Sequence, residues 1–193
     1  ATKLIRVQLT MRKLRFVSSN QYKIREAKTI LAKGGVRVIP VSAKIEELQT
    51  VDTHKLIEHK ALEAFQKIGR PLFVEHTTLS LLKLRGFPKG LTQIFWDTLE
   101  ADLVSKLFGN TRVTAETVIG YVDGMKLRTF RGKIKGTIAP FPRGPRGFQW
   151  DCVFLPDGYG QTFAQMGNLK NQISMRRKAL DKFCEFIKRR KGS

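Results

Sequence analysis

The segment Ser18-Ser19-Asn20-Gln21-Tyr22-Lys23 carries side chains suited to binding phosphate. It lies where a predicted strand gives way to a predicted helix, so backbone N–H groups and the helix dipole would add to the charge of Lys23. Ser18, Asn20 and Lys23 are therefore candidate phosphate-binding residues. The same residues also fit an ordinary helix start with Asn20 as the N-cap, and the sequence leaves both interpretations open.

Two further clusters could recognise a base. Phe148-Gln149-Trp150-Asp151 joins two aromatic rings to a carboxylate, a combination that can stack on a base and accept a hydrogen bond from its edge. A core segment with a buried tryptophan explains it equally well. Lys170, Ser174 and Arg176 lie near the start of the last predicted helix, where they would meet a phosphate and a base carbonyl or form a solvated face.

Other kinds of site are poorly represented in the sequence. The chain has no Gly-rich lysine loop of the Walker type, so a phosphate site would be of another kind. His54 and His59, on one predicted helix, each have a glutamate one turn further on, which is fewer ligands than zinc requires. The 2 cysteines, Cys152 and Cys184, exclude a disulfide scaffold and are interpreted as buried thiols.

Charge is the most unusual feature of the composition. The 193 residues include 36 lysines and arginines against 16 aspartates and glutamates, which gives a formal net charge of +20. This surplus indicates an anionic partner, such as nucleic acid, nucleotide phosphates or an acidic protein, without choosing among them. With 41% apolar residues and no apolar run near the ~20 residues of a membrane span, we expect a soluble, cytoplasmic protein with no membrane partner.

Alternating strand and helix patterns predict an α/β sheet with crossover helices. Ile5, Val7 and Leu9 alternate with polar residues, as in an extra N-terminal strand within residues 1–11. Residues 188–193 form a basic tail. Further strands are expected near 14–18, 36–41, 72–74, 113–122 and 125–138, the last two joined by a hairpin turn, and helices near 20–34, 53–68, 92–108 and 169–190.

Taken in order, these segments resemble the inosine triphosphate pyrophosphatase family, which cleaves deaminated purine nucleoside triphosphates to monophosphate and diphosphate. The likeness runs from about Arg15 to Phe186. Residues 18–23 look like the family's Thr-Gly-Asn-x-x-Lys turn, residues 73–77 like its Val-Glu-Asp-Thr segment, and residues 148–151 like Phe-Gly-Trp-Asp. Further matches follow in the same order: Gly86-Phe87-Pro88, Pro156-Asp157-Gly158, Thr162-Phe163-Ala164-Gln165-Met166 and Ser174-Met175-Arg176.

The resemblance implies a single α/β domain over residues 1–193, with a long twisted mixed sheet flanked by helices and a nucleotide cleft between two lobes. It also implies a homodimer and a Mg²⁺ cofactor, held by Glu47 and Glu75. The implied nucleotide-binding residues are Ser18, Asn20, Lys23, Lys60 and Lys170 for the phosphates, and Phe148, Trp150, Asp151, Ser174 and Arg176 for the base.

Departures from the family pattern fall at positions of the chemistry. His76 stands where the family has a magnesium-linked catalytic aspartate, and Mg²⁺ prefers carboxylate oxygens to imidazole. Met175 replaces a histidine, and Gln165 replaces a glutamate. Glu75 and His76 are therefore interpreted as a degenerate catalytic pair. In the alternative, His76 is a base near its ordinary pKa while Glu47 and Glu75 hold the metal.

Three hypotheses about function follow. The first is a catalytically impaired family member that binds a purine nucleoside triphosphate such as ITP, dITP or XTP and acts as a sensor. The resemblance extends to divergent members that serve in bacterial antiphage systems beside an NAD-consuming effector, and the charge of +20 would suit an acidic effector. The second is an active pyrophosphatase that releases the nucleoside monophosphate and diphosphate. The third is a basic module that binds nucleic acid or an acidic protein.

Overall fold

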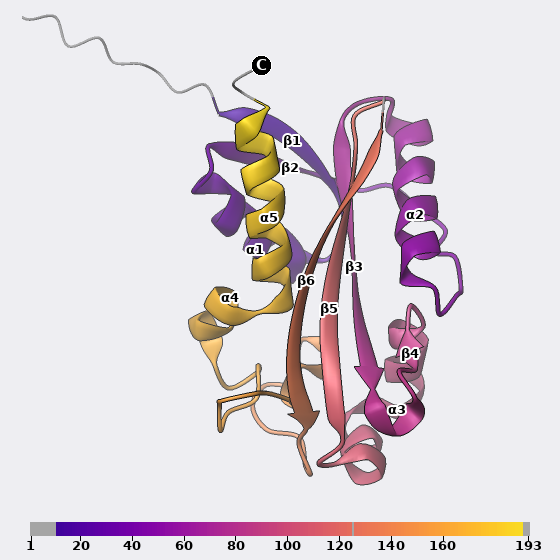
Figure 1. The fold of residues 1–193 in the computed structure, drawn as a ribbon, viewed down its shortest axis with the longest axis vertical. Helices are drawn as coiled ribbons and strands as arrows, with labels where there is room; N and C mark the ends of the chain where they lie inside the picture. The colour runs from indigo at the N-terminus through magenta and orange to yellow at the C-terminus, as the bar shows by residue number, and fades with distance from the viewer. Residues whose placement is uncertain (1–10, 125, 191–193) are drawn as a thin grey trace, which may run out of the picture.

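A computed structural model describes residues 11–124 and 126–190 of the 193-residue chain. Within these residues, a sheet of seven strands carries helices on both faces (Figure 1). The expected single α/β domain with a mixed sheet flanked by helices is confirmed. The strand predicted from Ile5, Val7 and Leu9 and the end of the basic tail, residues 191–193, fall outside the described residues.

The sheet combines parallel and antiparallel pairing. Its strands are β1 (Arg12–Val17), β2 (Val36–Val41), β3 (Leu72–Leu81), β4 (Pro88–Lys89), β5 (Arg112–Val122), β6 (Leu127–Ile138) and β7 (Phe154–Pro156). The order across the sheet is β2–β1–β3–β5–β6–β7, and β4 pairs with the end of β3. β1 is parallel to β2 and β3, whereas β5, β6 and β7 continue the sheet in antiparallel fashion. β3 is longer than the strand predicted near 72–74, because its full length pairs with β5.

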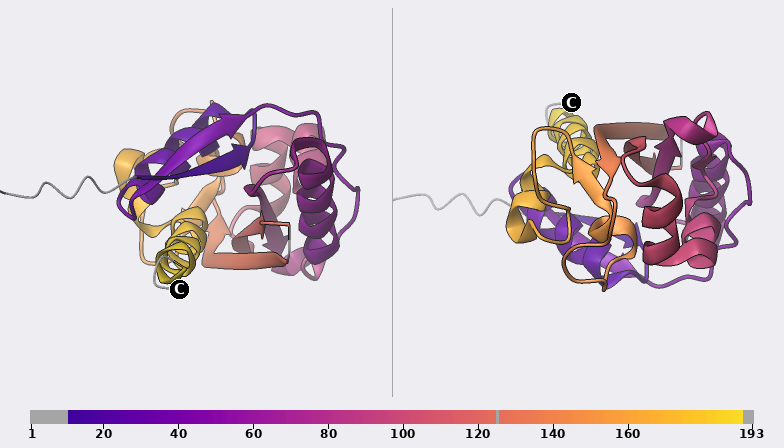
Figure 2. Two further views of the ribbon diagram at one scale, coloured as in Figure 1. Left: turned by 90° about the horizontal axis from the view of Figure 1, so that it is seen from above. Right: turned by 90° about the horizontal axis from the view of Figure 1, so that it is seen from below.

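The helices divide between the two faces of the sheet. They are α1 (Gln21–Ala32), α2 (Thr53–Ile68), α3 (Thr92–Phe108), α4 (Lys170–Ile173) and α5 (Met175–Arg189), with short 3₁₀ turns η1 (Leu82–Leu84), η2 (Gln149–Cys152) and η3 (Gly167–Leu169). α1 and α5 share a core around Phe73, Tyr121 and Phe183, and α2 packs on the other side around Val74 and Val118 (Figure 2). In the described part of the chain, none of them is long and apolar enough to cross a membrane.

Short polar side chains begin the helices that position the site. Asn20 accepts an N–H of the first turn of α1 at 3.1 Å, Asp52 accepts one from α2 at 2.9 Å, and Ser174 accepts one from α5 at 3.1 Å. The last of these corrects the prediction of one continuous helix over 169–190. Ser174 has extended backbone with ψ 159°, so η3 and α4 end before α5 begins in a new direction.

A close approach joins α5 to β6. A Cβ added to Gly132 would lie 2.0 Å from the carbonyl oxygen of Met175 and 2.6 Å from the nitrogen of Ala179. Any larger side chain would push helix and strand apart at this point. Gly132 therefore lets the start of α5 pack closely against the sheet. Arg176 lies in this first turn of α5, after the N-cap Ser174.

Replacing Gly132 by alanine should lower the free energy of unfolding by about 1–3 kcal/mol, because the added methyl group meets backbone atoms of α5. Urea denaturation measures this change. Gly160→Ala is the matched control, since a Cβ at that position meets nothing within 4 Å. Equal stability of the two variants would contradict the close approach.

Candidate functional site

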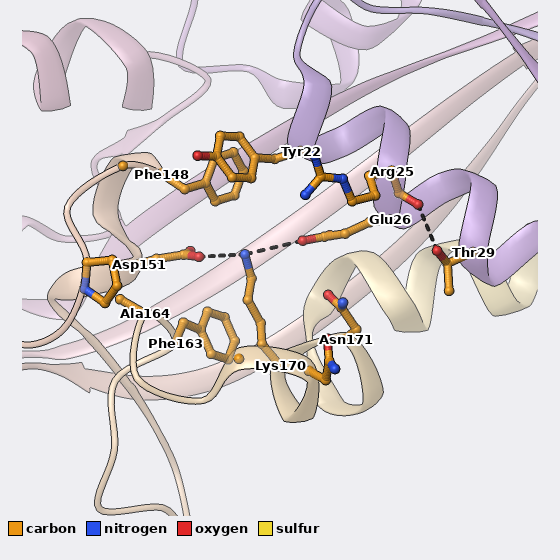
Figure 3. Close-up of a pocket in the computed structure, with 14 residues that line it drawn as sticks. Tyr22, Arg25, Glu26, Thr29, Phe148, Asp151, Phe163, Ala164, Lys170 and Asn171 are labelled. Atoms are coloured by element: carbon orange, nitrogen blue, oxygen red, sulfur yellow. Dashed lines mark hydrogen bonds and ion pairs between the residues drawn. The ribbon is translucent and has the colours of Figure 1, made fainter.

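A pocket of about 430 Å³ opens between α1, the loop before η2, and α4 (Figure 3). Tyr22 and Phe148 form an aromatic wall, with ring centroids 4.9 Å apart. Figure 3 shows Phe163 on the opposite side of Lys170 from Phe148, and Asp151 beside them. Aromatic rings with a few convergent polar groups are typical of a site for a flat heterocyclic ligand.

Lys170 is the central polar group of this pocket. Its Nζ donates to Asp151 Oδ2 at 2.5 Å and lies 3.4 Å from Glu26 Oε1. It also lies 4.4 Å from the centroid of the Phe148 ring. The side chains of Lys170 and Asp151 are only 7% and 8% exposed. Burial raises the pKa of Asp151, and the charge of Lys170 opposes that rise. The pocket thus presents a donor and an acceptor side by side.

Arg176 connects the pocket to the sheet. Its side chain is 1% exposed, and it donates to Glu75 through Nε at 2.7 Å and through Nη2 at 3.1 Å. Its Nη1 donates to Glu26 at 2.6 Å. Burial alone would lower the pKa of Arg176, but the two glutamates raise it above the ordinary value. The guanidinium therefore stays charged in the interior.

Glu75 has a second cationic partner. Lys23 Nζ lies 3.3 Å from Glu75 Oε1. Burial alone would raise the pKa of Glu75, but Arg176 and Lys23 together hold it well below its usual range. Burial lowers the pKa of Lys23, although the charge of Glu75 acts in the opposite direction. The groups form a buried chain of alternating charge whose formal sum is zero: Lys23, Glu75, Arg176, Glu26, Lys170 and Asp151.

A smaller polar cluster adjoins Lys23. Lys60 pairs with Glu47 and donates to the Glu75 carbonyl at 3.3 Å. His76 Nδ1 lies 3.9 Å from Glu47 Oε1, and within the described residues His76 Nε2 is buried without a hydrogen-bond partner. Burial, followed by the charges of Lys60 and Lys23, lowers the pKa of His76 to about 4. The imidazole is therefore neutral near pH 7.

The donor set fits a magnesium ion only in part. Mg²⁺ is commonly bound through one or two carboxylates together with substrate phosphates. Glu75 is occupied by Lys23 and Arg176, whereas the Glu47 side chain is 35% exposed. Across residues 11–124 and 126–190, no group of three His, Cys, Asp or Glu could hold a metal ion. The site therefore fits a magnesium ion that is bound mainly by the phosphates of a nucleotide. Glu47 is the carboxylate that could coordinate such an ion.

The residues predicted from the sequence form two groups in space. Phe148, Asp151 and Lys170 line the pocket. The other group gathers around the start of α1 and the middle of β3, and consists of Lys23, Lys60, Glu47, Glu75 and His76. Arg176 lies between the groups, bonded to Glu75 and indirectly, through Glu26, to Lys170.

Four other predicted residues lie in positions that support the fold. Trp150 is 2% exposed and packs against Phe154 and Phe163, outside the lining of the pocket. Ser174 and Asn20 cap helices, and Ser18 Oγ accepts the backbone N–H of Asn20 at 3.2 Å. Contact of these four with a ligand stays a prediction.

Sequence reasoning missed two residues that the pocket uses. Glu26 bridges Arg176 and Lys170, and Tyr22 supplies half of the aromatic wall. Their spacing contained a usable signal, because residues i and i+4 lie on one face of a helix. Because Lys23 is predicted to lie in the first turn of a helix, Tyr22 and Glu26 are expected in the same helix, four residues apart and on one face.

The family to which the sequence belongs is shown by direct comparison. A model of the Ham1 family matches residues 14–186. The chain belongs to the Ham1 family. It is 37% identical over 181 residues to the dITP/XTP pyrophosphatase of Methanopyrus kandleri, covering 91% of this chain and 96% of that protein. It is 36% identical over 179 residues to the inosine triphosphate pyrophosphatase of Yarrowia lipolytica, covering 89% and 94%.

Solved Ham1 structures share the fold of this chain. The HAM1 protein of Coxiella burnetii aligns with a TM-score of 0.73 at 23% identity, covering 92% of this chain and 98% of that one. The Ham1 protein of Staphylococcus aureus aligns with a TM-score of 0.70 at 22% identity, covering 91% and 98%. The architecture is therefore that of the Ham1 family.

The buried imidazole of this Ham1-family chain should make its stability depend on pH. The folded pKa of His76 is about 4 and the ordinary value is 6.5, so the unfolded chain binds more protons between these values. Stability is then lost as the pH falls through this window. Replacing His76 by glutamine should flatten the loss between pH 6.5 and 4.5, measured by urea denaturation at several pH values.

His54→Gln is the control for this measurement, because the His54 side chain is 59% exposed. It should keep the pH dependence of the unchanged protein. The same slope in both variants would mean that His76 titrates normally in the folded protein.

Proposed function

We propose that this chain binds a deaminated purine nucleoside triphosphate of the ITP, dITP or XTP type. The observation that carries the proposal is the buried chain of alternating charge from Lys23 to Asp151. It connects an aromatic pocket of about 430 Å³ to Lys23, which shares Glu75 with Lys60. The names of the relatives from Methanopyrus kandleri and Yarrowia lipolytica support the same class of ligand.

The polar pair in the pocket matches the edge of a 6-oxopurine. Hypoxanthine and xanthine offer a carbonyl at position 6 beside an N1–H, so they present an acceptor next to a donor. Lys170 would donate to the carbonyl, and the Asp151 carboxylate would accept the N1–H. Adenine reverses both groups, so its amino group would face the Lys170 ammonium and its N1 lone pair would face the Asp151 carboxylate, a mismatch that a site of this kind rejects strongly. Phe148 would stack on the face of the base.

The triphosphate would extend from the pocket toward Lys23 and Lys60. Both side chains are largely buried, at 16% and 14% exposure, so their charges are only weakly screened by solvent. A Mg²⁺ ion bound to the phosphates would supply charge neutralisation when present, and Glu47 would hold it. Lys60 would exchange Glu47 for a phosphate oxygen at the same time.

We further propose that hydrolysis is impaired. The support is that His76, a buried and neutral imidazole, stands where the sequence resemblance implies a catalytic carboxylate, while Glu75 is paired with Arg176 and Lys23. The second candidate function is an active pyrophosphatase, and it is favoured by the activity named for the relatives. The two candidates share one ligand and differ in turnover.

A binder without turnover would report nucleotide levels to another protein. The antiphage role, an acidic NAD-consuming effector and a homodimer stay predictions from the resemblance. A protein partner would find suitable apolar surface near η1 and α3, where the exposed side chains include Leu82 at 72% and Ile94 at 51%. A symmetric homodimer through that surface would bury both copies of it.

Binding should require the aromatic wall. Replacing Phe148 by alanine is expected to weaken binding of ITP about 10-fold or more, because base stacking on an aromatic ring contributes ~1–3 kcal/mol. Isothermal titration calorimetry with ITP, dITP, XTP and ATP in magnesium buffer measures this, and ATP should bind at least about 100-fold more weakly. Phe141→Ala is the control, since Phe141 is 60% exposed and lies outside the pocket lining. Equal losses in both variants would contradict the pocket assignment.

Turnover separates the two candidate functions. The unchanged protein, incubated with ITP and Mg²⁺, should return intact triphosphate, and His76→Asp should gain hydrolysis or metal affinity, because a carboxylate restores an oxygen ligand. Chromatography of the recovered nucleotide measures the products. Release of monophosphate by the unchanged protein, with loss of rate in His76→Asp, would establish the enzyme instead. His76→Asn, which restores no charge, is the matched control.

A further inference from the structure

A basic groove runs along β6, on the side of the sheet away from the pocket. Three adjoining hollows form the groove. The middle hollow shares Ser80 and Thr114 with one neighbour, and Arg131 and Lys133 with the other. Figure 1 shows that α2 accompanies the sheet only along the half where β3 begins, which leaves the other half of this face uncovered by α2. Apart from Arg112, which is paired with Asp157, the described cations of the groove are Lys89, Arg131, Lys133, Lys135, Lys178 and Lys182.

Three of these cations form a ladder on β6. Arg131, Lys133 and Lys135 occupy alternate positions, so their side chains leave the same face of the strand. The side chain of Lys133 is 60% exposed and that of Arg131 is 37% exposed. Alternate residues of a strand lie ~7 Å apart, so the ladder spans ~14 Å. Over that length, one strand of a nucleic-acid duplex carries about four phosphates.

Two lysines of α5 extend the ladder around the strand edge. Lys178 Nζ donates to the carbonyl of Lys133 at 3.2 Å, and Lys182 Nζ donates to the carbonyl of Arg131 at 2.7 Å. Each ammonium group has three N–H donors, so it keeps donors for a ligand after bonding one carbonyl. These contacts hold the charges in a row before any ligand arrives, which lowers the entropic cost of binding.

The acidic residues of the groove do not cancel this charge. Glu116 lies 3.4 Å from Arg131 and 3.5 Å from Lys133, so it is shared between two cations. Asp181 pairs with Arg177, and Asp52 accepts N–H groups at the start of α2. The buried charge chain at the nucleotide pocket is balanced within itself. The groove therefore carries an excess of positive charge that the proposed nucleotide does not use.

The composition of the groove favours nucleic acid over an acidic protein. Protein interfaces place aromatic and apolar anchors at their centre, whereas interfaces with nucleic acid are more polar and more positive. Among the described lining residues of the three hollows, no phenylalanine, tyrosine or tryptophan occurs, and hydroxyls of Thr53, Ser80 and Thr114 lie among the cations. Without rings to stack bases, the groove is suited to a duplex backbone rather than to an unpaired strand.

We propose that this groove binds the phosphodiester backbone of duplex nucleic acid without reading its sequence. The aromatic pocket and the ladder lie on different faces of the sheet, because Arg131 and Lys133 alternate along β6 with Gly132, which contacts α5. His76 shares the face of the ladder, two strands away from Arg131. The groove can therefore be occupied while a base fills the aromatic pocket. This assignment also gives a role to part of the +20 charge.

The test uses a triple variant, Arg131→Gln with Lys133→Gln and Lys135→Gln. Binding is measured by fluorescence anisotropy with labelled 20-base-pair duplexes of DNA and of RNA, between 50 and 200 mM KCl. At 50 mM KCl, the triple variant should bind each duplex at least about 10-fold more weakly than the unchanged protein does. The slope of log K against log salt should fall by ~2 to 3, since each lost phosphate contact removes ~0.9. The matched control, Lys28→Gln with Lys33→Gln and Arg37→Gln, removes the same charge from exposed positions on α1, at its C-cap and on β2, and should change affinity less than about 3-fold.

Other outcomes would overturn the proposal. Equal losses in the two triple variants would mean that net charge, and not the groove, drives binding. Polyglutamate that competes as well as a duplex of equal charge would point to an acidic protein, and tighter binding of single strands would exclude a duplex site. The DNA and RNA arms show which duplex is preferred. The triple variant should bind ITP as tightly as the unchanged protein does. Failure of the groove proposal can therefore be distinguished from failure of the nucleotide proposal.

Discussion

The guanidinium of Arg176 lies almost wholly out of water, between Glu75 on β3 and Glu26 on α1. Moving an ion into a protein interior costs several kcal/mol of solvation, and only close opposite charges and hydrogen bonds offset that cost. Three nitrogens of Arg176 donate to the two carboxylates. These bonds join α5, β3 and α1, and Glu26 also lines the pocket.

The same interaction links the two halves of the candidate site. Glu26 is shared with Lys170, which reaches Asp151 in the pocket, and Glu75 is shared with Lys23 at the start of α1. A phosphate near Lys23 would compete with Glu75 for that lysine, and a base in the pocket would compete for Lys170. Because the charges alternate along one buried chain, a ligand at one end would alter the electrostatic environment of the groups that follow it in the chain.

The molecule separates its charges into an interior that is balanced and a surface that is strongly basic. Inside, each described carboxylate of the alternating chain has a cation within 3.4 Å. Outside, on β6 and α5, Arg131, Lys133, Lys178 and Lys182 share few acidic neighbours. Net charge alone could not distinguish these regions, although they bind different kinds of anion in the functions proposed.

The sequence by itself determined the class of fold and most of the elements. The strand at 36–41 and the helix at 53–68 were predicted correctly, because hydrophobic period and a polar cap act within a few residues. The bounds of the helix predicted at 92–108 also agree, but Glu100 interrupts that helix with non-helical backbone, which the sequence did not predict. Ordered motifs also indicated the family. Only the tertiary structure decided that Trp150 packs inward while Phe148 lines the pocket, that Ser174 separates α4 from α5, and that Glu26 holds Arg176. The physical reason is that burial and charge pairing join residues up to 150 positions apart, a relation that no local pattern contains.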